Sequence, residues 1–340
     1  MKIDLRSDTL TKPTPAMLDF MMNAEVGDDV YKEDPSVNEL ERRIADMFGM
    51  DSALYFPTGS MTNQAAIKIH TQPGEQLIAD AYAHVYNYEG GGVSFNSGVS
   101  CKLLSGNRGM ITASQVEEAI NPPDFYHSPL TTLVCLENTT NKGGGACYDF
   151  EEIKKIKKVC EHHQLGLHLD GARLWNAMVA NDENPKDYGA IFDTISVCLS
   201  KGLGAPMGSV LVGKQQFMDK AIRVRKILGG GMRQVGYMAA AGIYALDHHI
   251  DRMHVDHQRA KELGAQLEGL DAIASVEVID TNIVIFKLLE GPSKQKFIDE
   301  LSNEKIAISD MGQGKLRIVT HLDYTESDHE RFLSFLGNFK

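Results

Sequence analysis

The chain has 340 residues, of which 43% are hydrophobic and 24% charged, a composition typical of a soluble globular protein with material for about two domains. Its net charge of −12 argues against nucleic acid and anionic membranes as partners, but it leaves room for a local basic pocket that binds a small anion. No apolar run approaches the ~20 residues of a membrane span, and the N-terminal stretch lacks the apolar core of a signal peptide. The five cysteines are odd in number and form no C-x-x-C pair, which favours a reduced, cytoplasmic protein and predicts no metal site.

The first strong element along the chain is a helix within residues 33–49. Asp34 can cap it, Pro35 fits its first turn and Gly49 can end it. Apolar side chains recur at helical spacing at positions 37, 40, 44 and 48. These signals predict an amphipathic helix with one buried stripe.

Strand-like and helical runs then alternate. Residues 131–139, 165–173 and 194–200 are short and largely apolar, and residues 149–164 between them form a charged amphipathic pattern. Such alternation predicts an α/β fold with a mostly parallel sheet covered by helices on both faces.

The last third of the chain has a different pattern. A long helix is predicted from about Val235 through residue 253 and beyond, followed by strand-like runs and two further helices. We therefore predict a large domain over residues 1–245 and a small α+β domain over residues 246–340. The histidine-rich stretch 247–257 lacks H-E-x-x-H, so we interpret it as a solvated helix face without a metal.

A glycine-rich loop follows the strand at 194–200. Gly202, Gly204 and Gly208 superficially match a dinucleotide fingerprint, but that fingerprint must open a helix whose N-terminus holds the pyrophosphate. Here Pro206 and a second apolar strand follow the glycines, so there is no helix N-terminus to bind a pyrophosphate and a nucleotide site is not predicted. What remains is a single lysine, Lys201, at the end of a buried strand.

Three other features suggest a role for this lysine, and one of them is Arg233, which follows three glycines where the main chain can approach a ligand closely. Asp170 follows an apolar strand, where it can be a helix cap or can hold a ring nitrogen protonated. Thr58, Gly59 and Ser60 open a helix after a strand and suit a phosphate. Pyridoxal phosphate needs a lysine to carry it, an acidic partner for its ring nitrogen and a phosphate anchor. The chain thus predicts a pyridoxal phosphate site, with a pKa of the lysine lowered by burial near a cation.

The successive motifs resemble those of L-threonine aldolases, of the low-specificity and L-allo-threonine type. The matching stretches span the large domain and reach the small one. They read LRSDTLTKPTPAM, GDDVYKEDPSVNELE, PTGSMTNQ, AHVYNYEGGG, LENTTN, HLDGARLWNA, LSKGLGAPMGSVLVG, GGGMRQVG and KLRIVTH. This family has the aspartate-aminotransferase-like fold, also called fold type I, of pyridoxal phosphate enzymes. Lys32 and Thr140 depart from its usual pattern.

The resemblance implies roles for the cofactor-binding residues. Lys201 would carry the cofactor, Asp170 would pair with its ring nitrogen and His84 would stack on the ring. Gly59 and Ser60 would hold the phosphate. Arg173 would lie near both cofactor and substrate, and Arg233 would reach the phosphate from a neighbouring subunit.

The resemblance also implies a substrate site. Ser7, Arg173 and Arg317 would surround the substrate carboxylate, and Tyr88 would lie near the substrate side chain. Alternation in residues 315–321 independently places Arg317 on the face opposite its apolar neighbours, toward a cleft or toward solvent. The proton of the substrate hydroxyl would go to His84, His127 or a water; His127 lies in a loop-like stretch.

The expected reaction is retro-aldol cleavage of L-threonine, L-allo-threonine and related β-hydroxy-α-amino acids to glycine and an aldehyde. The resemblance also implies a homotetramer built from dimers that share active sites. Two alternatives remain at this point. One is another pyridoxal phosphate enzyme, a β-eliminating lyase or an aminotransferase; the other is a binding protein without catalysis.

Overall fold

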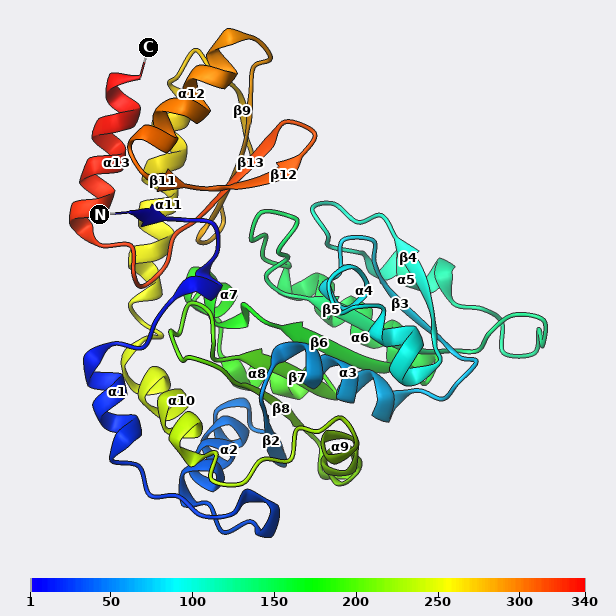
Figure 1. Ribbon diagram of the computed structural model, residues 1–340. Coiled ribbons are helices and arrows are strands. Elements are labelled where there is room, and N and C mark those ends of the chain that lie inside the picture. The colour runs from blue at the N-terminus through cyan, green and yellow to red at the C-terminus, as the bar shows by residue number, and fades with distance from the viewer. Residues whose placement is uncertain (1, 340) are drawn as a thin grey trace.

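The computed structural model describes residues 2–339 and shows a large α/β unit beside a smaller C-terminal unit (Figure 1). The large unit is built on a seven-stranded sheet with the order β2-β8-β7-β6-β5-β3-β4. In that order the strands are β2 (Ser52–Phe56), β8 (Ser209–Gly213), β7 (Thr194–Cys198), β6 (Gly166–Gly171), β5 (Thr131–Glu137), β3 (Gln76–Asp80) and β4 (Ser100–Leu104).

The predicted mostly parallel sheet is confirmed. The pairs β7–β6, β6–β5, β5–β3 and β3–β4 are parallel, whereas β8 runs antiparallel to both β7 and β2. Helices cover the sheet (Figure 1). They are α1 (Pro15–Met22), α2 (Pro35–Phe48), α3 (Gly59–His70), α4 (His84–Asn87), α5 (Ala113–Ala119), α6 (Phe150–His162), α7 (Leu174–Asn181), α8 (Pro185–Ile191), α9 (Gln215–Ile227) and α10 (Gly236–His248).

Helix α2 begins and ends as its sequence predicts. The Asp34 side chain accepts a hydrogen bond from Val37 N, Pro35 is the first helical residue, and Gly49 adopts the left-handed conformation with φ of 61°. The predicted apolar stripe is fully buried in the main core of the large unit. The short turns η1 (Asp8–Leu10), η2 (Asp29–Tyr31) and η3 (Val93–Ser97) complete this unit.

The glycine-rich loop after β7 leads directly into β8, so the predicted order of strand, loop and strand is confirmed. Gly204 and Gly208 in this loop have φ of 76° and 113°, which favour glycine. A Cβ on Gly208 would lie 2.4 Å from the Tyr55 hydroxyl. The loop therefore needs glycine to turn and to pack, and it opens no helix that could hold a pyrophosphate.

The small unit contains a four-stranded antiparallel sheet with the order β12-β13-β10-β9. Its elements are β9 (Ile273–Val276), β10 (Ile283–Leu288), β11 (Ile306–Ala307), β12 (Ser309–Gly312), β13 (Lys315–Val319), α11 (Met253–Glu268), α12 (Pro292–Asn303) and α13 (Glu326–Asn338). No helix among the described residues is long and apolar enough to cross a bilayer.

The predicted long helix from Val235 is in fact two helices, because α10 ends at His248 and α11 begins at Met253. The prediction of a solvated histidine face is wrong for two of its residues. His249 is buried and its Nδ1 lies 2.7 Å from the Leu203 carbonyl, and buried His257 accepts a hydrogen bond from Asn176. Burial lowers the pKa of His257 to about 4, so its imidazole is neutral.

The N-terminal segment packs with the small unit. Strand β1 (Ile3–Asp4) pairs in parallel with β11, and Ile3 and Leu5 are buried in the core of the C-terminal unit. The predicted boundary between residues 245 and 246 falls inside α10 and stays a prediction.

Candidate active site

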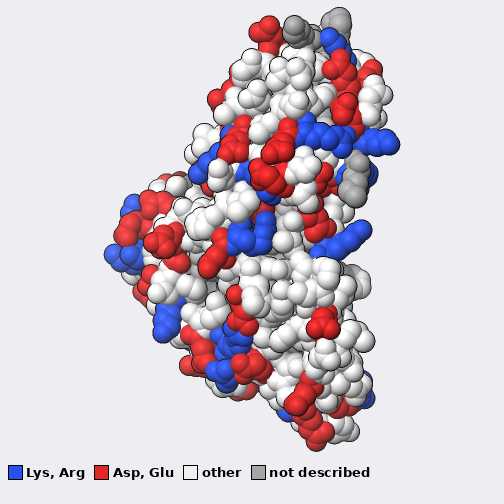
Figure 2. All heavy atoms as spheres, turned by 90° about the vertical axis from the view of Figure 1, so that its left-hand side faces the viewer, with Lys and Arg blue, Asp and Glu red and all other residues white. Residues whose placement is uncertain are grey.

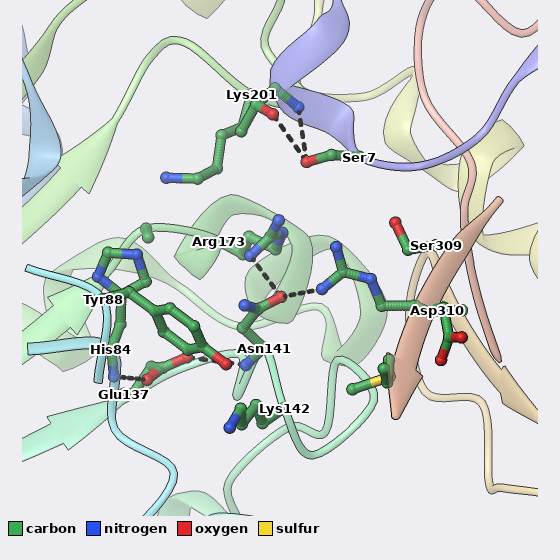
Figure 3. A pocket seen from close by; sticks show the side chains of 14 residues that line it. Ser7, His84, Tyr88, Glu137, Asn141, Lys142, Arg173, Lys201, Ser309 and Asp310 are labelled. Atoms are coloured by element: carbon green, nitrogen blue, oxygen red, sulfur yellow. Dashed lines mark hydrogen bonds between the residues drawn. The ribbon is translucent and has the colours of Figure 1, made fainter. Parts of the chain in front are cut away.

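Two adjoining cavities lie where the parallel strands end. The larger holds about 490 Å³ and the smaller about 360 Å³. Four residues line both cavities, namely Thr9, His84, Ala172 and Lys201. The two cavities are therefore parts of one site, and Figure 3 shows the larger one.

Lys201 follows β7 and lies between the two cavities. Its Nζ donates to Cys198 Sγ at 3.1 Å, and its carbonyl accepts a hydrogen bond from Thr11. Burial lowers the pKa of the amine, but the nearby Cys198 and Asp8 outweigh burial, so the pKa is raised. The predicted lowering of this pKa is therefore wrong for the chain alone.

Asp170 lies in β6, one residue before its end, and is buried in the lining of the smaller cavity. Its carboxylate accepts hydrogen bonds from Asn63 Nδ2 at 2.9 Å and from Ala172 N at 3.1 Å. On the other side of Asn63, its side-chain oxygen Oδ1 lies 3.2 Å from His168 Nε2. Burial lowers the pKa of His168 to about 3. The amide of Asn63 and a backbone N–H thus hold the Asp170 carboxylate in place, and a neutral His168 supports the amide from behind.

The N-terminus of α3 also lines the smaller cavity. Thr58 caps this helix by accepting a hydrogen bond from Met61 N at 3.2 Å. The first N–H groups of a helix lack intrahelical acceptors, so those of Gly59 and Ser60 are available to an anion. A lysine, a buried carboxylate and helix N–H groups around one cavity fit the amine, ring-nitrogen and phosphate contacts that pyridoxal phosphate requires.

His84 lines both cavities at the start of α4. Its Nδ1 lies 3.0 Å from Glu89 Oε1, and Glu89 also accepts hydrogen bonds from Asn63 and Gln64. Burial lowers the pKa of His84, but the Glu89 hydrogen bond and the charges of Asp170 and other carboxylates outweigh it, so the pKa is raised. The bond to Glu89 fixes the imidazole in one orientation beside Asp170.

Two arginines meet in the larger cavity. Arg173 donates to both carboxylate oxygens of Asp8, at 2.8 and 2.7 Å. Asn141 Oδ1 accepts from Arg173 at 3.3 Å and from Arg317 at 2.9 Å, so one amide joins the two guanidinium groups (Figure 3). We call Asp8, Asn141, Arg173 and Arg317 the arginine clamp.

The clamp is electrostatically arranged to bind an anion. Burial raises the pKa of Asp8, but Arg173 outweighs it and brings the pKa down to about 2. Burial and the charge of Arg173 lower the pKa of Arg317. Its buried Nε has no hydrogen-bond partner among the described residues, which leaves a donor for a ligand such as a carboxylate.

A second buried carboxylate, Glu137, ends β5 directly beside Asp170, its register partner on β6. It accepts hydrogen bonds from the backbone N–H groups of His84 and Asn141 at 2.7 and 2.8 Å. Burial and the charge of Asp170 raise its pKa to about 7. Glu137 can therefore hold a proton near neutral pH, in contact with the larger cavity.

Nine predicted site residues line the cavities. In the larger one are Ser7, His84, Tyr88, Arg173, Lys201 and Arg317; in the smaller one are Gly59, Ser60, His84, Asp170 and Lys201. Arg317 lies in the cleft and not on the outer surface, while Leu316 and Ile318 beside it are buried. The two departures from the family pattern lie outside both cavity linings: Lys32 binds Glu41 and Thr140 binds the Arg108 carbonyl.

Two predicted residues do not reach the cavities of their own chain. His127 is exposed in the loop between α5 and β5, which projects from the large unit (Figure 1). The Arg233 side chain is 58% exposed and pairs with Asp28 at 2.9 Å. The roles predicted for these two residues therefore stay predictions.

Sequence reasoning missed five supporting residues: Asp8, Asn63, Glu89, Glu137 and Asn141. Each lies within a motif quoted above, and all except Glu89, which holds His84 five residues away, act on a residue that is distant in the sequence. The available signal was that these polar residues lie in the same motifs as the predicted site residues. The sequence alone does not show which residues they contact.

Comparison with known proteins agrees with this geometry. The family model of the beta-eliminating lyases matches residues 4–290. Low-specificity L-threonine aldolase 1 of Arabidopsis thaliana is 39% identical, with 98% of this chain and 94% of the relative covered. Threonine aldolase of Leishmania major has a similar structure, with TM-score 0.85, 23% identity and 98% of each chain covered.

A more distant structure, a lysine-to-alanine variant of serine palmitoyltransferase from S. paucimobilis with bound PLP-myriocin aldimine, has TM-score 0.74 and 18% identity, with 98% of this chain and 86% of the other covered. At such identities the two structural likenesses show the fold alone, which is the predicted fold type I of pyridoxal phosphate enzymes. The identity over nearly the whole length carries the family assignment. The chain belongs to the beta-eliminating lyase family and, within it, to the low-specificity L-threonine aldolases.

Proposed function

We propose that the protein is a pyridoxal phosphate-dependent aldolase that cleaves L-threonine, L-allo-threonine and related β-hydroxy-α-amino acids to glycine and an aldehyde. The observation that carries the proposal is that a cavity suited to the cofactor adjoins a cavity suited to an amino acid. Lys201, Asp170 and the α3 N-terminus surround the smaller cavity, and the arginine clamp opens into the larger one.

The smaller cavity would hold the cofactor, which when bound supplies an electron sink for the electron pair left on Cα. Lys201 would carry it, and the N–H groups of Gly59 and Ser60 would bind its phosphate. Asp170 would keep its ring nitrogen protonated, because the carboxylate is buried and held by neutral donors. His84 would pack against the ring, held in place by Glu89.

The larger cavity would bind the amino acid. Arg317 and Arg173, with Ser7, would hold the α-carboxylate, and a guanidinium can do so through two parallel hydrogen bonds. His84 keeps a proton on Nδ1 toward Glu89, which leaves Nε2 to exchange a proton with the substrate hydroxyl. Tyr88 would contact the β-substituent.

The direct test is product analysis of the protein reconstituted with pyridoxal phosphate. We expect L-threonine and L-allo-threonine to yield equal amounts of glycine and acetaldehyde. Formation of 2-oxobutyrate and ammonia from L-threonine, or of pyruvate and ammonia from L-serine, would instead identify a β-eliminating lyase, and amino-group exchange with a keto acid would identify an aminotransferase. Absence of turnover with every amino acid would favour a binding protein.

We further propose a cytoplasmic homotetramer whose dimers share active sites. Support comes from Arg233, which is exposed in its own chain although its motif predicts a phosphate contact. His127 is likewise exposed and free to reach another subunit.

Mixing Lys201→Ala chains with Arg233→Ala chains tests the shared site, provided that mass measurement confirms subunit exchange. Some mixed dimers then contain one site with both residues intact, and activity should rise above that of either parent. If exchange is complete and activity does not rise, the sites are not shared.

A further inference from the structure

Lys142 contributes an unpaired positive charge to the wall of the larger cavity. Its Nζ lies 5.2 Å from the centre of the Tyr88 ring and 5.8 Å from that of Tyr82. Within residues 2–339, we find no hydrogen bond or ion pair made by this ammonium group. Stacking over two aromatic rings holds the amine near the cavity while leaving its three N–H donors available.

The acidic groups nearest in the cavity lining are already bound elsewhere. Glu137 accepts the backbone N–H groups of His84 and Asn141, and Asp310 accepts Gly312 N at 2.7 Å. Neither carboxylate forms an ion pair with Lys142 within 4.0 Å. The cavity therefore presents a cation whose counter-charge the lining residues do not supply.

Lys142 is also separate from the arginine clamp. Figure 3 shows it on the side of the cavity opposite Lys201, beyond Asn141 and Tyr88. A substrate whose α-carboxylate lies between Arg173 and Arg317 would have its β-substituent free to extend toward Tyr88 and Lys142. The larger cavity thus contains two positive regions, one for the α-carboxylate and one for a second anionic group.

We propose that Lys142 selects β-hydroxy-α-amino acids that carry a carboxylate on Cβ, such as L-3-hydroxyaspartate. The inference rests on the proposed aldolase function and names a substrate class for the same site. Cleavage breaks the Cα–Cβ bond, the hydroxyl proton passes to a base and Cα takes up a proton. The products are glycine and glyoxylate, which together contain all atoms of the substrate.

The experiment compares L-3-hydroxyaspartate with L-3-hydroxyasparagine, which has nearly the same size but no charge on its side chain. With the reconstituted holoenzyme we expect kcat/KM to favour hydroxyaspartate about tenfold, as for one partly shielded ion pair. Lys142→Met keeps the aliphatic length, and it should abolish this preference mainly through KM. Lys142→Arg keeps the charge and should retain the preference.

L-Threonine serves as the internal control in every variant. Its kcat/KM should change less than about threefold in Lys142→Met, since a methyl substituent makes no ion pair. If the wild type cleaves L-threonine but shows no preference for hydroxyaspartate, or if Lys142→Met keeps the preference, the inference is wrong and the aldolase function stands. If the wild type does not cleave L-threonine, the aldolase function itself fails.

Discussion

The smaller cavity and the arginine clamp are built in different ways. Around the smaller cavity, Asp170 lies near the end of β6, Lys201 follows the neighbouring strand β7, and Gly59 opens the helix after β2. The clamp joins Asp8, Asn141 and Arg173 to Arg317 on a strand of the other unit. The sheet positions the groups that we propose act in bond cleavage, whereas contact between the two units creates the proposed anion site. We therefore expect substitutions around the smaller cavity to lower kcat and substitutions in the arginine clamp to raise KM.

The largest expected effect comes from Lys201→Ala. Loss of the only lysine that lines the described part of the smaller cavity should reduce kcat by at least about 10³-fold, because covalent catalysis needs the amine. Borohydride reduction of the wild-type holoenzyme and peptide mapping should find the cofactor on Lys201. Lys155→Ala, on an exposed helix face, is the matched control. Labelling of a different lysine would contradict the assignment.

Asp170→Asn should lower kcat by about 10²- to 10³-fold, the usual size of one lost electrostatic contact to the transition state. The amide still fills the space beside Asn63 but carries no negative charge to stabilise a protonated ring nitrogen. Cofactor absorbance measures binding, which should persist, and steady-state kinetics measures turnover. A variant with normal kcat would show that Asp170 acts only as a structural residue.

Arg317→Lys should raise KM for L-threonine by about tenfold or more and change kcat less, because lysine cannot make the bidentate contact. Arg42→Lys, in an exposed pair on α2, controls for the general effect of the substitution. A fall in kcat with KM unchanged would contradict the division between cavity and clamp. It would indicate that the arginine acts in the transition state alone.

The smallest expected effect concerns stability at Glu137. Its folded-state pKa of about 7 exceeds the ordinary value of 4.5, so unfolding releases a proton between these pH values. Stability from this group is thus fully present below about pH 4.5 and is lost as pH rises through 7. Glu137→Gln should remove this loss. The Tm difference, variant minus wild type, should become more positive from pH 5.5 to pH 8 in thermal scans, and a constant difference would contradict the raised pKa.

Local patterns in the sequence predicted most of the large unit. The caps of α2, the alternation of strands and helices and the strand-loop-strand around Lys201 are confirmed because each depends on neighbours in the chain. The prediction of a single long helix from Val235 was wrong, because the chain turns at residues 249–252. There His249 packs on the glycine-rich loop through the Leu203 carbonyl. Only tertiary contacts specify that break.

For the site, patterns of residue type predicted Lys201, Asp170 and residues 58–60, which line one cavity in the structure. Arg173 and Ser7 were identified by family resemblance, and their supports Asp8 and Asn141 were missed. These contacts bridge long stretches of sequence, which a single sequence does not reveal. The raised pKa of Lys201 likewise depends on Cys198 and Asp8 packing around it.

The pairing of β1 with β11 gives the N-terminal segment a mechanical role. The Arg6 carbonyl accepts hydrogen bonds from Arg317 and Ser309, both in the small unit, and Ser7 comes next in the chain. The next residue, Asp8, is bound to Arg173 of the large unit through both of its carboxylate oxygens. Ser7 therefore lies where the chain passes from contacts with the small unit to contacts with the large one. We expect a rotation of the small unit to change the distance between Arg317 and Arg173 while Ser7 stays linked to both units.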